Sequence, residues 1–357
     1  FVRSGLLELS YDRDTGDSWE LQGHLSELAQ PGMVIAQAEL DGAGQVRLEG
    51  EELAGLSGGL RFAADGIAPD DPDLAAAIGD SLHGQTRFDW LPDNALELAD
   101  LTVSGDDYGL TGDFLLGGLA GGVTISGQVE ADLADLSRLS GLAGRPLTGS
   151  SHAGISGHVA LLTRAFSVDA RLEGRDITAD QPQLDRLLAG RSVITLAADR
   201  HDEGIELSEL TVETGRLSVD AGGTISSRDA DLAATLRLDS LASVDKGIVG
   251  ALAAQENLTG PAGTRRLELN GEAVDLQTGI ARLDAALRGE TVLRLAARQQ
   301  GEGAVIEALR LANPQLSLTG EGNLMPGAMD AQVTASVPDF GVLDPDRNLI
   351  TFYQPLA

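Results

Sequence analysis

The sequence contains no cysteine among its 357 residues. Disulfide bonds, thiolate metal sites and catalytic thiols are therefore excluded. Aromatic residues make up only 3% of the chain, so its apolar surface must consist almost wholly of aliphatic side chains. Aromatic rings supply much of the bulk of ordinary cores. A smooth aliphatic surface suits flexible alkyl chains better than it suits stacked rings or sugars.

Positive charge is also scarce. The 25 Lys and Arg residues are outnumbered by 55 Asp and Glu residues, which gives a formal net charge of −30. This balance disfavours nucleic acid as a partner, because phosphates need a basic surface. It also disfavours docking flat on an anionic lipid surface. The acidic residues are spread out, as in Glu206, Glu209 and Asp220, which is typical of the solvated face of a sheet.

Long apolar runs and leader-like segments are missing as well. No stretch of about 18 apolar residues is present, so we expect no helix that spans a bilayer. No secretory signal is seen either. The chain begins at Phe1 rather than Met. We interpret it as a segment of a longer protein.

No motif for metal binding or catalysis is complete. The five histidines are scattered, and the acidic residues Asp70, Asp71 and Asp73 do not have the spacing of a calcium loop. The glycine-rich stretch 117–122 is not followed by the Gly-Lys-Ser/Thr of a phosphate loop, and we interpret it as a hairpin turn. We therefore expect no metal, no cofactor and no enzymatic activity.

A strand–turn–strand motif occurs three times. Residues 98–112 read LADLTVSGDDYGLTG, residues 207–221 read LSELTVETGRLSVDA, and residues 306–320 read IEALRLANPQLSLTG. The three stretches align without a gap, and a fixed period is the mark of a repeat architecture. Apolar residues stand at four matched places in each stretch: Leu98, Leu101, Val103 and Leu110; Leu207, Leu210, Val212 and Val219; Ile306, Leu309, Leu311 and Leu318.

Period-two alternation dominates the rest of the chain and predicts roughly twenty strands separated by Gly, Asp and Asn turns. Three segments with helix periodicity interrupt it, after Asp71-Pro72, after Gln181-Pro182 and after Thr278-Gly279, and each closes on Gly. Segments 135–139, 239–241 and 339–343 predict strands that end in a single helical turn. Segment 243–262 is either a helix over 248–254 or a loose loop. We expect one continuous body with approximate repeat units 1–70, 71–179, 180–277 and 278–357.

Such a sheet has one apolar face along its length, and two arrangements hide that face. The sheet either packs on itself as a sandwich or barrel, or folds into an open trough whose interior stays apolar. In the second case the twelve matched aliphatics line one continuous wall, since alternate strand residues point the same way. Periodicity does not decide between the two.

The order of the motifs resembles the TamB family of translocation and assembly proteins, within the AsmA-like group of Gram-negative envelope proteins. The resemblance rests on LADLTVSGDDYGLTG, on QVEADLADLSRL from Gln128 and on GLAGRPLTGS from Gly141 to Ser150. It implies an all-β fold: an elongated, twisted, mostly antiparallel sheet folded into a U-shaped hydrophobic groove (a β-taco), with a few short interrupting helices.

The resemblance also implies a function. The protein is expected to lie in the periplasm, tethered to the inner membrane by an N-terminal anchor outside this segment. It is expected to carry phospholipid acyl chains between the inner and outer membranes, and to act in outer-membrane protein assembly with an Omp85-type barrel.

Two alternatives stay open at this stage. An extracellular β-solenoid adhesin or passenger is also acidic, Gly-rich and Cys-poor, but its coils repeat every 18–30 residues or so and carry polar ladders. A purely structural periplasmic scaffold handles unfolded outer-membrane proteins by pairing with its sheet edges.

Overall fold

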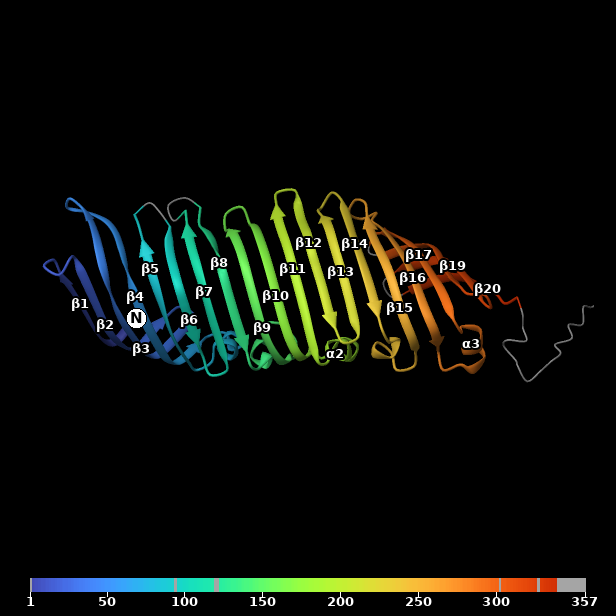
Figure 1. Ribbon diagram of the computed structural model, residues 1–357, viewed down its shortest axis with the longest axis horizontal. Helices are drawn as coiled ribbons and strands as arrows, with labels where there is room; N and C mark the ends of the chain where they lie inside the picture. Colours follow the sequence, from blue (N-terminus) through green and yellow to red (C-terminus); the bar gives the residue numbers. More distant parts are fainter. Residues whose placement is uncertain (1, 93–94, 119–121, 302, 326–327, 339–357) are drawn as a thin grey trace, which may run out of the picture. The chain divides into compact units, whose positions relative to one another are not determined.

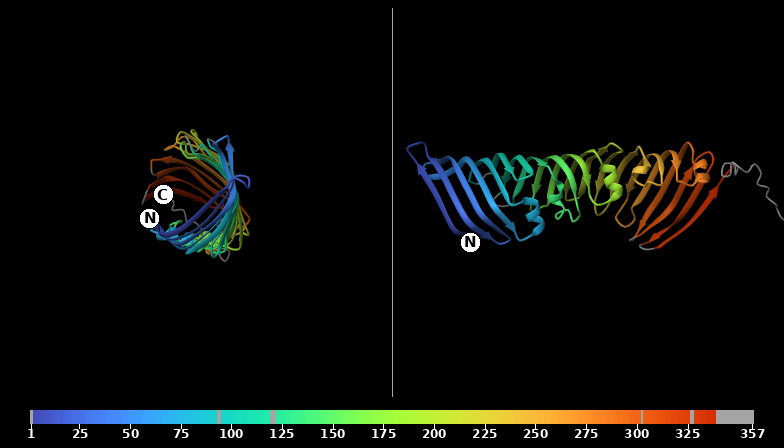
Figure 2. Two further views of the ribbon diagram at one scale, coloured as in Figure 1. Left: turned by 90° about the vertical axis from the view of Figure 1, so that its left-hand side faces the viewer. Right: turned by 90° about the horizontal axis from the view of Figure 1, so that it is seen from below.

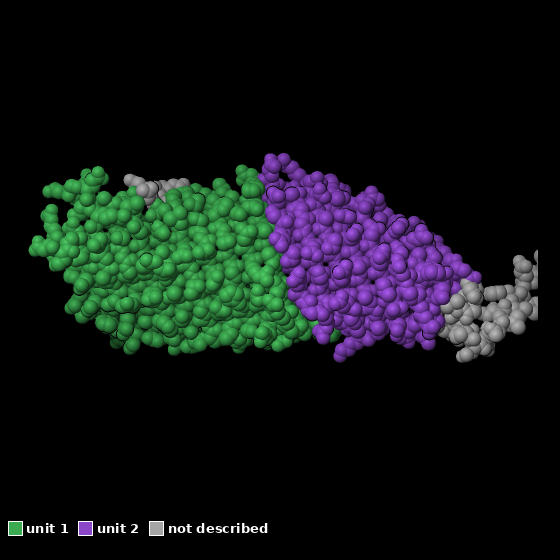
Figure 3. Space-filling model, in the orientation of Figure 1, with its two compact units in different colours: residues 1–202 green, residues 203–357 purple. Residues whose placement is uncertain are grey.

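The protein is all-β. The computed structural model describes residues 2–92, 95–118, 122–301, 303–325 and 328–338, and these residues form twenty strands and three short α-helices. Two compact units divide the chain, residues 1–202 and residues 203–357 (Figure 3). The expected number of strands is confirmed.

The first unit contains eleven strands, which lie side by side in chain order (Figure 1). Helix α1 interrupts the series after β4, a 3-10 turn η1 follows β8, and helix α2 follows β10. The elements are β1 (Val2–Asp12), β2 (Ser18–Gln30), β3 (Met33–Glu49), β4 (Glu52–Pro69), α1 (Pro72–Ile78), β5 (Ser81–Trp90), β6 (Leu96–Ser104), β7 (Tyr108–Gly117), β8 (Thr124–Leu133), η1 (Leu136–Leu139), β9 (Thr148–Ala160), β10 (Ala165–Thr178), α2 (Pro182–Leu188) and β11 (Arg191–His201).

The second unit contains nine strands in the same arrangement. A 3-10 turn η2 follows β14, and helix α3 follows β16. The elements are β12 (Gly204–Thr214), β13 (Leu217–Ile225), β14 (Ala230–Leu238), η2 (Leu241–Ser243), β15 (Val249–Thr259), β16 (Arg266–Gln277), α3 (Ala281–Ala286), β17 (Glu290–Gln300), β18 (Gly303–Ala312), β19 (Ser317–Met325) and β20 (Ala328–Ser336).

Segment 243–262 differs from both interpretations of its sequence. It is neither a helix over 248–254 nor a loose loop, because β15 occupies Val249–Thr259 and pairs with β14 and β16. Alanines lie on both faces of this strand, so the alternation of apolar and polar residues that predicts a strand is weak here. The helical turns expected after β8 and β14 are confirmed as η1 and η2. The third such turn, in segment 339–343, lies outside the described residues, as does much of the glycine-rich stretch 117–122.

Each strand pairs antiparallel with the strand that follows it in its unit, from β1–β2 to β10–β11 and from β12–β13 to β19–β20. Neither ladder closes on itself within the described ranges. Figure 2 shows from two further sides that the longer strands of the first unit, β2 to β4, bend along their length. The register between β3 and β4 shifts at Arg47 and Leu48, next to the turn that joins these strands.

The register separates the two faces of the sheet. In the first unit one row of paired positions crosses all eleven strands and is wholly apolar, and the next row is almost wholly polar. The apolar row is Leu7, Gly23, Leu40, Phe62, Gly84, Val103, Leu110, Ala131, Ala153, Leu172 and Ile194. The polar row is Glu8, Gln22, Asp41, Arg61, Gln85, Thr102, Thr111, Glu130, Gly154, Arg171 and Thr195. We name the two sides the apolar face and the polar face.

Of the three α-helices that the structure describes, only α1 has the side-chain N-cap that its sequence predicts. Asp71 caps α1, because its carboxylate accepts the N–H groups of Asp73 at 2.8 Å and of Leu74 at 3.3 Å. Gln181 makes no such bond at the start of α2. There, the carboxylate of Asp185 inside the first turn accepts the N–H of Ala179 at 2.7 Å. Asp284 of α3 does the same for Thr278, ninety-nine positions later in the chain.

These helix-start bonds give a stability prediction. Replacing Asp185 with Ala leaves the Ala179 N–H without its acceptor, and a lost cap of this kind costs about 1 kcal/mol. Asp185→Asn keeps an acceptor oxygen and is expected to lose less. Urea denaturation followed by circular dichroism measures both, with Asp169→Ala on the polar face of β10 as the control. Equal losses in the Ala and Asn variants would contradict the role of the oxygen.

Candidate functional site

The twelve aliphatics of the repeated motif all lie on the apolar face, and the structure pairs them identically in each repeat. Val103 pairs with Leu110, Val212 with Val219, and Leu311 with Leu318. The remaining members face glycine or alanine at equivalent positions, except that Leu98 faces Phe114. Those pairs are Leu98 with Phe114, Leu101 with Gly112, Leu207 with Gly223, Leu210 with Ala221, Ile306 with Gly322 and Leu309 with Gly320.

A β-bulge explains the three-residue spacing inside the motif. Strict alternation would place the first and second leucine of L-x-x-L on opposite faces. The register shifts between Leu98 and Leu101, between Leu207 and Leu210, and again between Ile306 and Leu309. The extra residue of the bulge returns the second leucine to the apolar face.

In the first repeat, the bulge is held by side chains of the polar face. Asp100 has a positive φ of 49°, its N–H donates to the Asp113 carboxylate at 2.9 Å, and its own carboxylate pairs with Arg87. Asp is one of the few residues that adopt this backbone conformation without a large strain. In this repeat, Asp100 and Asp113 therefore hold the bulge in place.

The two sets of four in the second unit do not form one cluster. In the second unit, strands β14 to β17 lie between the set on β12–β13 and the set on β18–β19. These intervening strands continue the apolar face, and their side chains were not among the predicted wall residues. Period-two alternation alone identifies them. Examples are Leu232, Leu236, Leu258, Leu267, Leu269, Leu293 and Leu295.

In the second unit, three complete rows make up this face, and we name each by its first residue. The Val212 row is Val212, Val219, Leu236, Ala254, Gly271, Leu293, Leu311, Leu318 and Ala335. The Leu210 row is Leu210, Ala221, Ala234, Glu256, Leu269, Leu295, Leu309, Gly320 and Val333. The Leu207 row is Leu207, Gly223, Leu232, Leu258, Leu267, Ala297, Ile306, Gly322 and Ala331. Residues 203–338 include no aromatic residue, so this surface is aliphatic throughout.

Burial separates this face from an ordinary core. All twelve predicted residues are half-buried, neither sealed from solvent nor freely exposed. Several fully buried apolar side chains of the second unit lie at the end of its strands next to α3, although Ala254 within the Val212 row is also buried, as is Ala230 at the other end of β14. Ala286 and Leu287 of the α3 region and Leu316 are 0%, 4% and 4% exposed, and Leu311 and Leu318 pack against them. Helix α3 thus seals one edge of the apolar face and leaves the middle rows half-open.

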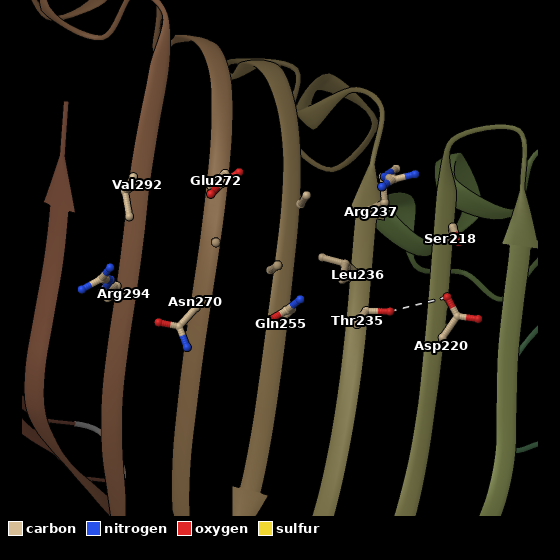
Figure 4. Close-up of a pocket in the computed structure, with 13 residues that line it drawn as sticks. Ser218, Asp220, Thr235, Leu236, Arg237, Gln255, Asn270, Glu272, Val292 and Arg294 are labelled. Carbon is tan, nitrogen blue, oxygen red and sulfur yellow. Dashed lines mark hydrogen bonds between the residues drawn. The ribbon is translucent and has the colours of Figure 1, made fainter. Parts of the chain in front are cut away.

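The polar face carries hollows lined by charged and amide side chains. One of about 610 Å³ lies across β13 to β17 in the second unit, where Asp220, Arg237, Glu272 and Arg294 surround it (Figure 4). Thr235 donates to the Asp220 carboxylate there at 3.5 Å. Charges of both signs line this shallow surface, and no group of three or more metal-ligating side chains is found in the described parts of the chain. The polar face therefore has the character of a solvated surface.

A second polar hollow, in the first unit, contains two perturbed titratable groups. His152 Nδ1 lies 2.8 Å from Asp132 Oδ1, and this hydrogen bond raises the pKa of His152, with nearby Glu130 and Glu173 adding to the effect. Hydrogen bonds from Arg191 and Arg171 lower the pKa of Glu173. Both side chains are well exposed to solvent, so these shifts mark surface ion pairs.

Comparisons with protein-family models, with curated proteins and with solved structures gave no match to this chain. Among the described residues, no helix is both long and apolar enough to cross a membrane. The fold defines a class of protein: an all-β protein of antiparallel ladders, each with one apolar face and one polar face. Its function rests on the geometry of those faces.

The His152–Asp132 contact gives a prediction for pH dependence. The pKa of His152 in the folded protein lies above its value near 6.5 in the unfolded chain. The contact therefore stabilises the fold at lower pH, and this stabilisation is lost as pH rises through the folded-state pKa of His152. Asp132→Asn should lower the pKa of His152 in an NMR titration and remove the contact's stabilisation at pH 5 more than at pH 8. Asp169→Asn, on the same face of β10, is the control. An unchanged His152 titration in Asp132→Asn would contradict the assignment.

Proposed function

We propose that this chain is a lipid-conducting segment of a bridge-like protein, and that its apolar face carries phospholipid acyl chains between two membranes. The observation that carries the proposal is the half-burial of the twelve matched aliphatics, on a face whose rows are apolar except at Glu256. A sealed core would bury these side chains, and a surface shaped only for solubility would not align them in register across every strand.

Acyl chains fit this surface for a simple energetic reason. Each methylene that leaves water for an apolar surface gains about 0.8 kcal/mol. The headgroup would stay in water at the open edge, because burying its charges is costly. Leucine, alanine and glycine offer contact area without fixed polar anchors. A chain held in this way can slide along the rows, which favours conduction over storage at one site.

The proposal extends to the form of the face and to the setting of the protein. We infer that each ladder folds around its apolar face as a U-shaped groove of the β-taco kind. The motifs that resemble the TamB family support a place in the periplasm of a Gram-negative envelope, with an inner-membrane anchor and an Omp85-type barrel as partner through parts outside this segment. A role in outer-membrane protein assembly is part of the same proposal.

The composition of the rows favours this function over a β-solenoid adhesin. Such coils carry ladders of Asn or Thr. In the three rows that cross the second unit, the described positions hold neither residue. Asn270, Thr235 and Thr319 lie on the polar face instead.

Two neighbouring residues on opposite faces test the proposal. Val219→Asp places a carboxylate at the second position of the Val212 row, whereas Ser218→Asp places the same charge on the polar face opposite Arg237. Val219→Asp should reduce lipid bound to the purified chain at least about tenfold, because a charge in contact with acyl chains loses its hydration. Ser218→Asp should bind as the unchanged protein does. Native mass spectrometry after incubation with phospholipid vesicles measures both.

Folding is monitored in the same variants. On a half-buried face Val219→Asp is expected to leave the far-ultraviolet circular dichroism unchanged and to lower the urea midpoint only slightly. Leu210→Asp or Leu210→Arg should behave in the same way. Outright unfolding of these variants would indicate a closed core, and lipid binding that equals that of Ser218→Asp would refute conduction along this face.

A further inference from the structure

One acidic residue interrupts the aliphatic face of the second unit. Glu256 lies in the Leu210 row, where its neighbours in register are Ala234 on β14 and Leu269 on β16. The rows on either side place Ala254 and Leu258 next to it along its own strand. The three complete rows contain twenty-seven positions in nine strands, and Glu256 is the single ionisable residue among them.

Charge compensation for Glu256 is lacking on this face. No salt bridge or hydrogen bond of its carboxylate is seen within the described ranges, although the neighbouring strands carry many arginines. Arg237, Arg266 and Arg294 stand at polar-face positions of the register. A half-buried carboxylate among aliphatics is costly unless a partner of opposite charge approaches it. The Glu256 carboxylate is therefore available to pair with a cationic group of a ligand.

The position along the strand favours a headgroup over an acyl chain. Glu256 lies three residues before the end of β15 at Thr259, on the side away from η2 and α3. At the same rim, the backbone carbonyl of Arg265 accepts the N–H of Gln299, which extends the β16–β17 ladder by one position. Arg265 donates through Nη2 to the Ser226 carbonyl at 3.0 Å, and its Nε is buried without a partner in the described structure.

We propose that Glu256 selects the headgroup of the lipid carried by this face, favouring a phospholipid with a primary amine, such as an ethanolamine headgroup, over an anionic one. This inference rests on the proposed lipid-carrying function. The ammonium group pairs with the Glu256 carboxylate, and Arg265 at the rim supplies positive charge for the phosphate. An anionic glycerol headgroup offers no cation and is repelled by the same carboxylate.

The test compares two lipids on the whole 357-residue chain. The protein is incubated with vesicles of phosphatidylcholine that contain equal amounts of phosphatidylethanolamine and phosphatidylglycerol. Bound lipid is then counted by native mass spectrometry. Glu256→Gln removes the charge and keeps the shape of the side chain. The matched control is Glu272→Gln, which makes the same change at an exposed position on the polar face of the adjacent strand β16.

The unchanged chain and Glu272→Gln should bind more of the ethanolamine lipid than of the glycerol lipid. In Glu256→Gln this ratio should fall about fivefold, the factor that corresponds to about 1 kcal/mol for an ion pair of this exposure. If all three proteins bind both lipids in equal ratio, headgroup selection is refuted while lipid carriage stands. If the unchanged chain binds neither lipid, the proposed function fails and this inference fails with it.

Discussion

The antiparallel backbone ladder is the constraint on which the rest of this structure depends. Because each strand pairs with its neighbour in the chain, one register links side chains across every strand of a unit. A slip of one residue would exchange the apolar face and the polar face. The apolar face therefore depends on the bulges between Leu98 and Leu101 and at the equivalent places in the other two repeats. Each absorbs one residue and keeps the next leucine in its row.

Much of this arrangement follows from the sequence. The alternation predicts the strands, Asp71-Pro72 predicts the start of α1, and the matched leucines predict a common face. The bulge does not follow, because L-x-x-L is equally compatible with a helical turn until its partner strand is known. Strand β15 was missed for a similar reason. Ala251, Ala253 and Ala254 place small apolar groups on both faces, and alanine favours helix in isolation.

The pairing of β15 with β14 and β16 overrides that local preference for helix. No short window of sequence contains this pairing.

The position of Glu256 also depends on the pairing of the strands. In a chain with 55 acidic residues, one more glutamate carries no signal by itself. Only the register places it among Ala234 and Leu269 rather than among the solvated carboxylates. The division of the chain into four repeat units stays a prediction.

The two units differ in how their apolar faces are filled. In the first unit Trp19 lies over glycines of β3 and β4, so that a Cβ on Gly58 would come within 2.4 Å of its ring. Its ring centroid is 5.9 Å from that of Phe88, and its side chain is 7% exposed. Aromatic bulk thus occupies the space that glycine leaves free. In the second unit Gly223, Gly271 and Gly320 also stand in the apolar rows, but residues 203–338 contain no ring to cover them. The neighbours of these glycines are backbone atoms and aliphatic side chains, such as Leu252 beside Gly271 and Leu309 beside Gly320, so a guest hydrocarbon would meet an aliphatic surface there.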